Sequence, residues 1–187
     1  MIINFRTPMR STVLPLAALC AGALAACSPP AGTQGSPDGG TFIAVSSDMN
    51  GYHSWQRYDA GSDVVDQVHS NGLRTDYINK VPHHGQTEFD IGTIVIKEVA
   101  SEDGGPPQIF AMAKRGGGYN DGGALNWEWF SLQDAGTGDN IEIVWRGEGP
   151  PQNDNYGASH EACNECHASL AGSNDFVASP PLQLSNF

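Results

Sequence analysis

Four runs of strand-forming residues follow one another between Gly92 and Glu148, and they constrain the fold more than any other feature. Each run alternates apolar with polar residues, or is rich in β-branched and aromatic side chains, as β-strands are. Clusters of Gly, Pro, Asp and Asn separate the runs, so neighbouring strands are expected to be antiparallel. The sequence therefore predicts a mainly β (α+β) fold, an antiparallel sheet with a few short helices. The runs are residues 92–100, 108–115, 125–132 and 140–148.

A C-x-x-C-H motif lies near the end of the chain, in the stretch ASHEACNECHASL, residues 158–170. Cys163 and Cys166 are three residues apart, so on a turn or short helix each thiol can bond one vinyl group of a haem. His167 then presents its imidazole on the same side, where Nε2 can bind the iron. A redox C-x-x-C needs no histidine there, and a zinc site needs further ligands. The motif predicts one covalently attached haem c on a C-terminal helix.

The first 26 residues have the composition of an export signal. They hold Arg6 and Arg10 and no acidic residue, and they continue into an apolar run that ends in small residues. This run is too short and too alanine-rich at its end to be a good transmembrane span. The sequence LAAC, which ends at Cys27, resembles the lipobox of bacterial lipoproteins and implies a diacylglyceryl group on Cys27. The alternative is an ordinary secretory signal, cut near Ala26, that leaves a free cysteine.

The residues after Cys27 extend this prediction. Residues 27–40 are rich in Pro, Gly and Ser and predict a flexible tether, and residues 41–187 predict one haem domain. Ser28 follows Cys27 where an aspartate would oppose passage to the outer membrane. We therefore expect an exported protein, lipid-anchored in the periplasm at the outer membrane. Haem c is attached outside the cytoplasm, so the export signal and the haem motif agree.

The chain is acidic, with a formal net charge of −12. Loss of Arg6 and Arg10 with the signal takes this charge from −12 to −14. Nucleic acid is therefore not an expected partner. A cationic redox partner such as a basic cytochrome, or a small uncharged molecule, fits this charge, although solubility alone also explains it.

The stretch SSDMNGYHSWQRYDAGS, residues 46–62, predicts a helix. Ser46 or Ser47 is a candidate N-cap, and aromatic residues at 52, 55 and 58 recur on one helix face. With the sheet before the haem motif, this order of elements excludes two common architectures. Small electron-carrier cytochromes are helical and carry the motif early, and cytochromes c′ carry it late but have no strands.

In this order the pieces of the chain resemble the cytochrome P-460 family and its non-catalytic relative, cytochrome c′-beta, over residues 42–180. The haem motif is the most specific of the matching pieces, and the order and spacing of the others complete the resemblance. The pieces are NGYHSWQRY, DYINKV, FDIGTIVIKE, LNWEWFSL, CNECH and DFVASPPL.

The resemblance implies one haem with His167 as its proximal ligand and a five-coordinate iron that faces an enclosed distal pocket. In cytochrome P-460 a lysine at the place of Lys97 is covalently bound to the haem macrocycle. This bond is tied to the oxidation of hydroxylamine to nitrous oxide or nitrite. From the residues alone, a lysine in IVIKEV is typical of an edge or a solvent-facing position. Both interpretations of Lys97 remain open.

A catalytic member also needs a distal base, because hydroxylamine loses protons as its electrons leave. The resemblance places this acid after the strand that matches residues 108–115, where this chain offers Tyr119 and Asp121 but no glutamate. Asp121 is the candidate base, although Asn-Asp-Gly is also a standard turn sequence. A distal pocket capped by Phe89 or Phe110 would instead suit capture of nitric oxide.

Other candidate ligands have simpler interpretations. His83 and His84 are adjacent, and neighbouring side chains on an extended chain point apart, so we expect a loop rather than a metal site. His160 is expected to be a cap or to lie behind the haem ligand. Met49 and Met112 are possible axial ligands, and Met112 is more typical of a core.

Three functions therefore remain open. The first is an enzyme that oxidises hydroxylamine, and the second is a protein that binds or detoxifies nitric oxide without turnover. The third is a periplasmic electron carrier, which would need a sixth ligand such as Met112. Dimers occur among relatives, so a homodimer is also possible.

Overall fold

The computed structural model describes residues 40–61, 72–136, 139–149 and 162–187, all within the unit Gly32–Phe187. The predicted export signal, Cys27, the predicted tether up to residue 39 and His160 lie outside these ranges. No helix in the described ranges is both long enough and apolar enough to span a bilayer.

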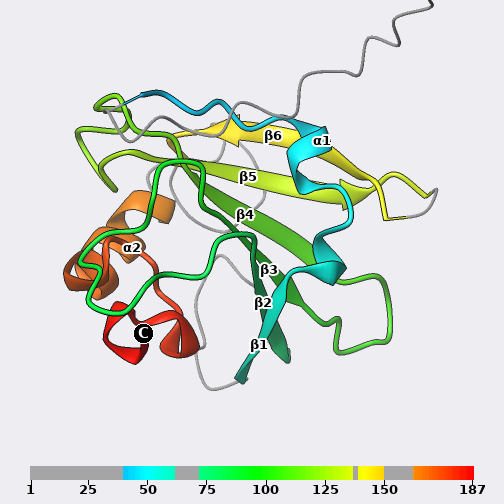
Figure 1. Ribbon diagram of the computed structural model, residues 1–187. Helices are drawn as coiled ribbons and strands as arrows, with labels where there is room; N and C mark the ends of the chain where they lie inside the picture. The colour runs from blue at the N-terminus through cyan, green and yellow to red at the C-terminus, as the bar shows by residue number, and fades with distance from the viewer. Residues whose placement is uncertain (1–39, 62–71, 137–138, 150–161) are drawn as a thin grey trace, which may run out of the picture. The chain divides into compact units, whose positions relative to one another are not determined.

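The centre of the fold is an open antiparallel sheet of six strands in sequence order (Figure 1). The predicted mainly β fold is thereby confirmed, and the last four strands lie at the four predicted runs. Each connection joins neighbouring strands, as in a meander. The strands are β1 (Gln56–Gly61), β2 (Arg74–Ile78), β3 (Ile94–Val99), β4 (Gln108–Lys114), β5 (Trp127–Asp134) and β6 (Ile141–Gly147).

The sequence analysis missed strands β1 and β2. Strand β1 lies at the edge of the sheet and is largely exposed, so it needs no apolar alternation. Strand β2 is largely buried although it contains Arg74 and Asp76. Charged residues are rarely buried, and a pattern search therefore assigns such a stretch to a loop.

The predicted helix over residues 46–62 is wrong. Helix α1 spans only Ser46–Met49, a 3₁₀ turn η1 spans Tyr52–Ser54, and Tyr58 lies in β1. Val45, rather than a serine, is the N-cap. The helix stops at Asn50, whose backbone is extended with ψ 142°, and Gly51 follows with φ 70°, a left-handed conformation that glycine adopts without strain.

The register divides the side chains of the sheet between two faces. We call the face with Val95, Met112 and Trp129 the α2 face, because its core includes residues of the C-terminal segment. The opposite face is the α1 face, whose core includes Met49. One row of directly paired residues crosses all six strands on the α2 face. This row is Tyr58, Asp76, Lys97, Phe110, Ser131 and Trp145.

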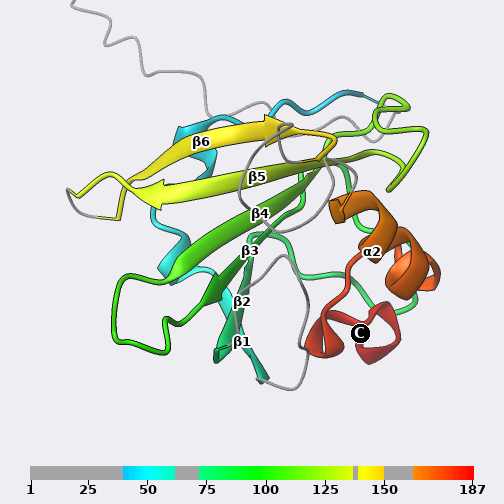
Figure 2. The ribbon, with the colours of Figure 1, turned by 180° about the vertical axis from the view of Figure 1, so that it is seen from behind.

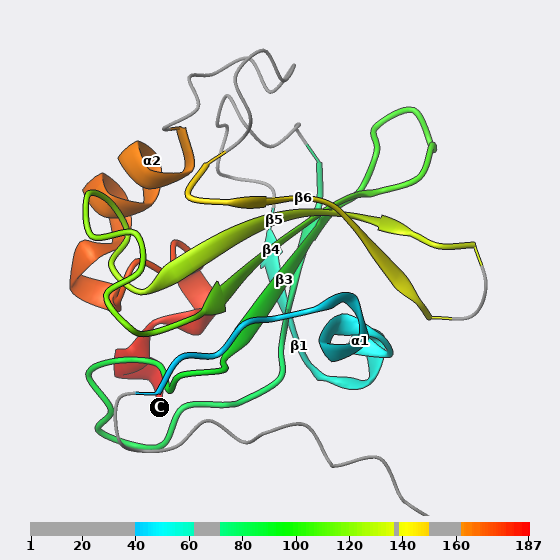
Figure 3. The same ribbon diagram turned by 90° about the horizontal axis from the view of Figure 1, so that it is seen from above.

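Each face has its own cover (Figures 2 and 3). The α1 face is covered by the segment with α1 and η1, and Tyr52 is fully buried there. The α2 face is covered by helix α2, Ala162–Ala171, and by three 3₁₀ turns that follow it. These turns are η2 (Gly172–Asn174), η3 (Pro180–Leu182) and η4 (Leu184–Asn186). The sheet thus separates the early segment from the one that carries the C-x-x-C-H motif.

Candidate functional site

Helix α2 carries the three residues of the C-x-x-C-H motif. Cys163 and Cys166 form no disulfide and are partly buried, and Cys163 packs against the core of the α2 face. Burial raises the pKa of the Cys163 thiol to about 12. A redox-active C-x-x-C has a cysteine whose pKa is lowered, so this environment does not favour thiol–disulfide chemistry.

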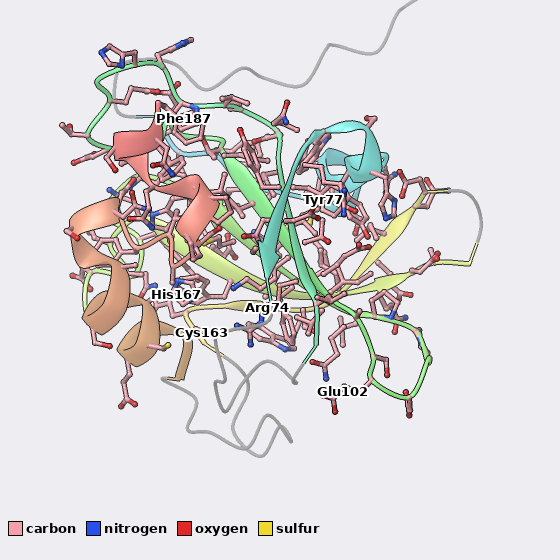
Figure 4. The ribbon with its side chains drawn as sticks, turned by 90° about the horizontal axis from the view of Figure 1, so that it is seen from below. Arg74, Tyr77, Glu102, Cys163, His167 and Phe187 are labelled. Carbon is pink, nitrogen blue, oxygen red and sulfur yellow. The ribbon has the colours of Figure 1, made fainter. Side chains whose placement is uncertain are left out.

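The imidazole of His167 is buried and held in one orientation. Its Nδ1 lies 2.7 Å from the carbonyl oxygen of Phe176. A carbonyl can only accept, so Nδ1 carries the hydrogen and Nε2 carries the lone pair that can bind a metal. The indole of Trp129 packs beside the ring, with the two centroids 4.5 Å apart. Figure 4 shows His167 and Cys163 on the same helix.

The carbonyl of Phe176 belongs to a left-handed turn. Asp175 has φ 48° and Phe176 has φ 65°, a conformation that is unfavourable for residues other than glycine. The Asp175 carboxylate accepts hydrogen bonds from Lys114 Nζ at 2.5 Å and from the Phe89 amide at 2.8 Å. The Trp127 indole donates a third bond, at 3.4 Å. Burial raises the pKa of Asp175, and Lys114 acts in the opposite direction.

Asn164, inside the motif, joins α2 to the loop between β4 and β5 and to β5 itself. Its Oδ1 accepts hydrogen bonds from Asn120 Nδ2 at 2.7 Å and from Trp129 Nε1 at 3.0 Å. Its Nδ2 donates to Asn120 Oδ1 at 2.8 Å. The amide of Ala124 donates to the same Oδ1 at 3.3 Å. Nothing in the sequence marks this variable position of the motif as an anchor, and the analysis missed it.

Lys97 lies on the α2 face, the same face as Trp129, whose ring touches His167. Its nearest neighbours across the strands are Asp76 and Phe110. The side chain is half-buried and makes no hydrogen bond or ion pair with any residue in the described ranges. The interpretation of Lys97 as an edge-strand residue is wrong, because β3 has a paired strand on each side.

Arg74 and Asp76 are two further charged residues that the sequence analysis missed. Both belong to β2 and share the α2 face with Lys97. Asp76 is fully buried, and its Oδ2 accepts a hydrogen bond from the hydroxyl of Ser179 in the C-terminal segment. Arg74 is 5% exposed. Buried charges that share a face with candidate ligands are typical of functional sites.

The remaining predicted site residues lie in different parts of the fold. Asp121 is exposed, in the loop between β4 and β5. Phe110 adjoins Lys97, whereas Phe89 packs edge-to-face on Trp127, with ring centroids 5.9 Å apart. Met112 is buried on the α2 face and pairs with Trp129, and Met49 is buried on the α1 face. The structure therefore brings Lys97, Phe110 and Met112 to one face with the motif.

His83 and His84 lie in the loop between β2 and β3 and are exposed. His84 Nδ1 lies 2.6 Å from the backbone oxygen of Phe187. Across the described ranges, no group of three His, Cys, Asp or Glu side chains is arranged to hold a metal ion.

Comparison of the chain with protein-family models, curated proteins and solved structures finds no match. The site must therefore be interpreted from its own chemistry. Its donors fit a covalently held haem, because two cysteines outside any disulfide and an imidazole whose Nδ1 carries the hydrogen lie on one helix. The core that adjoins Cys163 includes Met112 and Trp129, so its surroundings are apolar, as a macrocycle requires.

Proposed function

We propose that this chain is an exported mono-haem c-type cytochrome that binds small nitrogen species and oxidises hydroxylamine. The proposal follows the resemblance to cytochrome P-460, and the observation that carries it is the geometry of His167. Its Nδ1 is committed to the Phe176 carbonyl, which leaves Nε2 as the metal-binding nitrogen, beside thiols with attachment spacing. A lipid on Cys27 would anchor the protein in the periplasm.

When bound, the haem would supply the centre at which the nitrogen species binds and gives up electrons. The chain's residues would do the rest. Cys163 and Cys166 would hold the macrocycle, and His167 would hold the iron from one side. Lys97 is on the same sheet face as these residues and has no partner among the described residues, which supports its bonding to the macrocycle. Electrons would leave to a separate redox protein.

Protons released from hydroxylamine need an acceptor on the protein. Asp121 is the acceptor predicted from the resemblance, and its exposed position would deliver protons directly to solvent. Asp76 is a second carboxylate, buried in the row of Lys97, with the Ser179 hydroxyl on its Oδ2. The variants D121N and D76N distinguish the two candidates. Only the substitution of the true proton acceptor should lower turnover while the protein keeps its haem.

A second candidate function is binding of nitric oxide without turnover. Two observations favour it. The aromatic ring of Phe110 adjoins Lys97 in the row across the sheet, and the exposed Asp121 belongs to a loop rich in turn residues. A site with an apolar cap and no proton acceptor could hold a small neutral ligand but could not oxidise hydroxylamine.

The deciding experiment is an optical spectrum of the reduced protein, together with mass mapping of its haem peptides. A broad, strongly red-shifted Soret band, and a haem peptide that carries both the α2 segment and the Lys97 segment, would support hydroxylamine oxidation. An ordinary c-type spectrum with haem on Cys163 and Cys166 alone would exclude the Lys97 bond and leave nitric oxide binding. Absence of haem from protein that was produced in cells able to attach haem c would refute both proposed functions.

A further inference from the structure

We propose that Asp175, held by Lys114, is a positioning residue that sets the orientation of the His167 imidazole through the backbone carbonyl of Phe176. This inference rests on the proposed haem function for its purpose. The geometry behind it concerns the chain alone, so it can be tested whether or not a haem is attached.

The first step of the argument is the strained turn. Asp175 and Phe176 both have a left-handed backbone, with φ 48° and 65°. Two successive non-glycine residues in this region persist only when surrounding contacts hold them there. The consequence of the turn is that the Phe176 carbonyl points at His167 Nδ1, 2.7 Å away. A strained conformation whose product is an oriented ligand histidine indicates a functional constraint.

The second step is what holds the turn. The side chains of Asp175 and Lys114 are 5% and 4% exposed, and their charged atoms lie 2.5 Å apart. The same carboxylate also accepts hydrogen bonds from the Phe89 amide and from the Trp127 indole. These donors come from β4, from β5 and from the loop before β3, so the carboxylate ties the turn to the rigid sheet. A buried charge pair is weak evidence for stability alone, and specificity of conformation is its better-attested use.

The third step concerns the other side of the turn. Asn174 donates to the carbonyls of Val177 and Leu182 and accepts from the Leu184 amide. It therefore holds the chain after the turn, whereas Asp175 holds the turn itself against the sheet. Asp175 is thus the residue whose replacement should release the Phe176 carbonyl while the tail stays packed.

The consequence for a bound metal is electronic. A carbonyl fixed on Nδ1–H of a ligand imidazole holds the ring orientation and raises the basicity of Nε2. In this chain the orientation is set twice, by the Phe176 carbonyl and by the Trp129 ring. Loosening the turn should therefore affect Nδ1–H first and leave the ring contact in place.

The test compares two double variants that both remove the buried charges. The Phe89 amide and the Trp127 indole donate to different oxygens of Asp175. In K114M/D175N the single asparagine oxygen can still accept from the Phe89 amide, whereas K114M/D175L retains no acceptor. Replacing a buried ion pair by neutral groups of similar volume is often tolerated, so both should fold. The readout is exchange of the His167 Nδ1 proton with solvent, measured by NMR. Haem-bearing protein is studied in its reduced, carbon monoxide-bound, diamagnetic form, and a chain without haem is studied directly.

We expect exchange of the Nδ1 proton to be at least about tenfold faster in K114M/D175L than in the wild type, because the hydrogen bond loses its fixed acceptor. K114M/D175N should exchange within about twofold of the wild type. The backbone amide of Met112 reports global opening and should be unchanged in both. Wild-type Nδ1 exchange in K114M/D175L, or equal acceleration of Met112, would overturn the positioning role.

A third variant tests the proposal if K114M/D175L does not fold. W127F removes one donor to Asp175 and keeps a buried aromatic ring, and it should accelerate Nδ1 exchange by a smaller factor. No acceleration in W127F, with K114M/D175L unfolded, also counts against the proposal. Absence of haem in wild-type protein would refute the proposed function and leave this exchange experiment interpretable in the haem-free chain.

Discussion

Lys97 and Glu98 are neighbours on β3, and their side chains therefore point to opposite faces of the sheet. Lys97 lies on the α2 face with Trp129, whose ring contacts His167. Glu98 lies on the α1 face, where it accepts hydrogen bonds from the hydroxyls of Tyr52 and Tyr77 and contacts His53. One dipeptide thus serves two separate polar sites, and substitutions at the two positions should have unrelated effects.

Replacement of Lys97 by methionine should change the spectrum and leave stability nearly intact. The lysine makes no ion pair in the described ranges, so we expect the free energy of unfolding to change by less than about 1 kcal/mol. The Soret band should shift to that of an ordinary haem c, and the Lys97 segment should leave the haem peptide. K97R, which keeps the charge but not the primary amine, should match K97M. An unchanged haem peptide in both variants would show that Lys97 forms no bond.

The cluster around His53 should make stability depend on pH. Burial lowers the pKa of His53, but hydrogen bonds and charges of Asp139 and Glu98 outweigh it, and the pKa is raised above 6.5. A raised pKa contributes stability that is fully present below the unfolded value of 6.5 and is lost as pH rises through the folded value. Because the side chain is 52% exposed, the effect is small.

We therefore expect the Tm of the wild type to exceed that of H53Q by about 1–3 °C at pH 6, with the difference vanishing above pH 8. The exposed His83 supplies a control, and H83Q should follow the wild type at every pH. A Tm difference between wild type and H53Q that grew with pH would contradict this assignment of the charge.

Asn164 should be the residue that most strongly fixes α2 on the sheet. N164A leaves the Trp129 indole and the Ala124 amide without their acceptor and breaks both bonds to Asn120. Unsatisfied buried donors cost about 1–3 kcal/mol each, so we expect a loss of about 2–4 kcal/mol in the free energy of unfolding. The exposed neighbour Glu165 supplies the control, and E165A should change it by less than about 0.5 kcal/mol. Equal effects of the two substitutions in chemical denaturation would show that the Asn164 bonds contribute little.

The sequence predicts the last four strands of the sheet well, because each contains alternating apolar residues or a run of β-branched and aromatic residues. Residues 92–148 show it, and β3 to β6 lie there. The orientation of Lys97 could not be predicted, because a shift of one residue in register would move it to the other face. Strand β2 was missed because its buried Arg74 and Asp76 resemble loop residues until their surroundings are known.

The positioning residues were hidden for a different reason. Asp175 stands in SNDF, which has the composition of a turn, and only the fold brings Lys114 to it from 61 positions away. Asn164 occupies a position of the motif that attachment chemistry leaves free. Residues that act by long-range hydrogen bonds have no local periodicity, so no pattern along the chain identifies them.

Two adjacent glycines give the sharpest test of how α2 is seated. A Cβ built on Gly123 would lie 2.3 Å from Cγ and 2.4 Å from Nδ2 of Asn164, whereas one on Gly122 would meet nothing within 4 Å. Neither residue has a left-handed φ, so alanine fits the backbone at both positions and reduces the entropy of the unfolded chain equally. G123A must push Asn164 from its partners, at a cost of about 2–3 kcal/mol. G122A should unfold within about 0.5 kcal/mol of the wild type in urea. Wild-type stability in G123A would mean that α2 can shift without losing the Asn164 contacts.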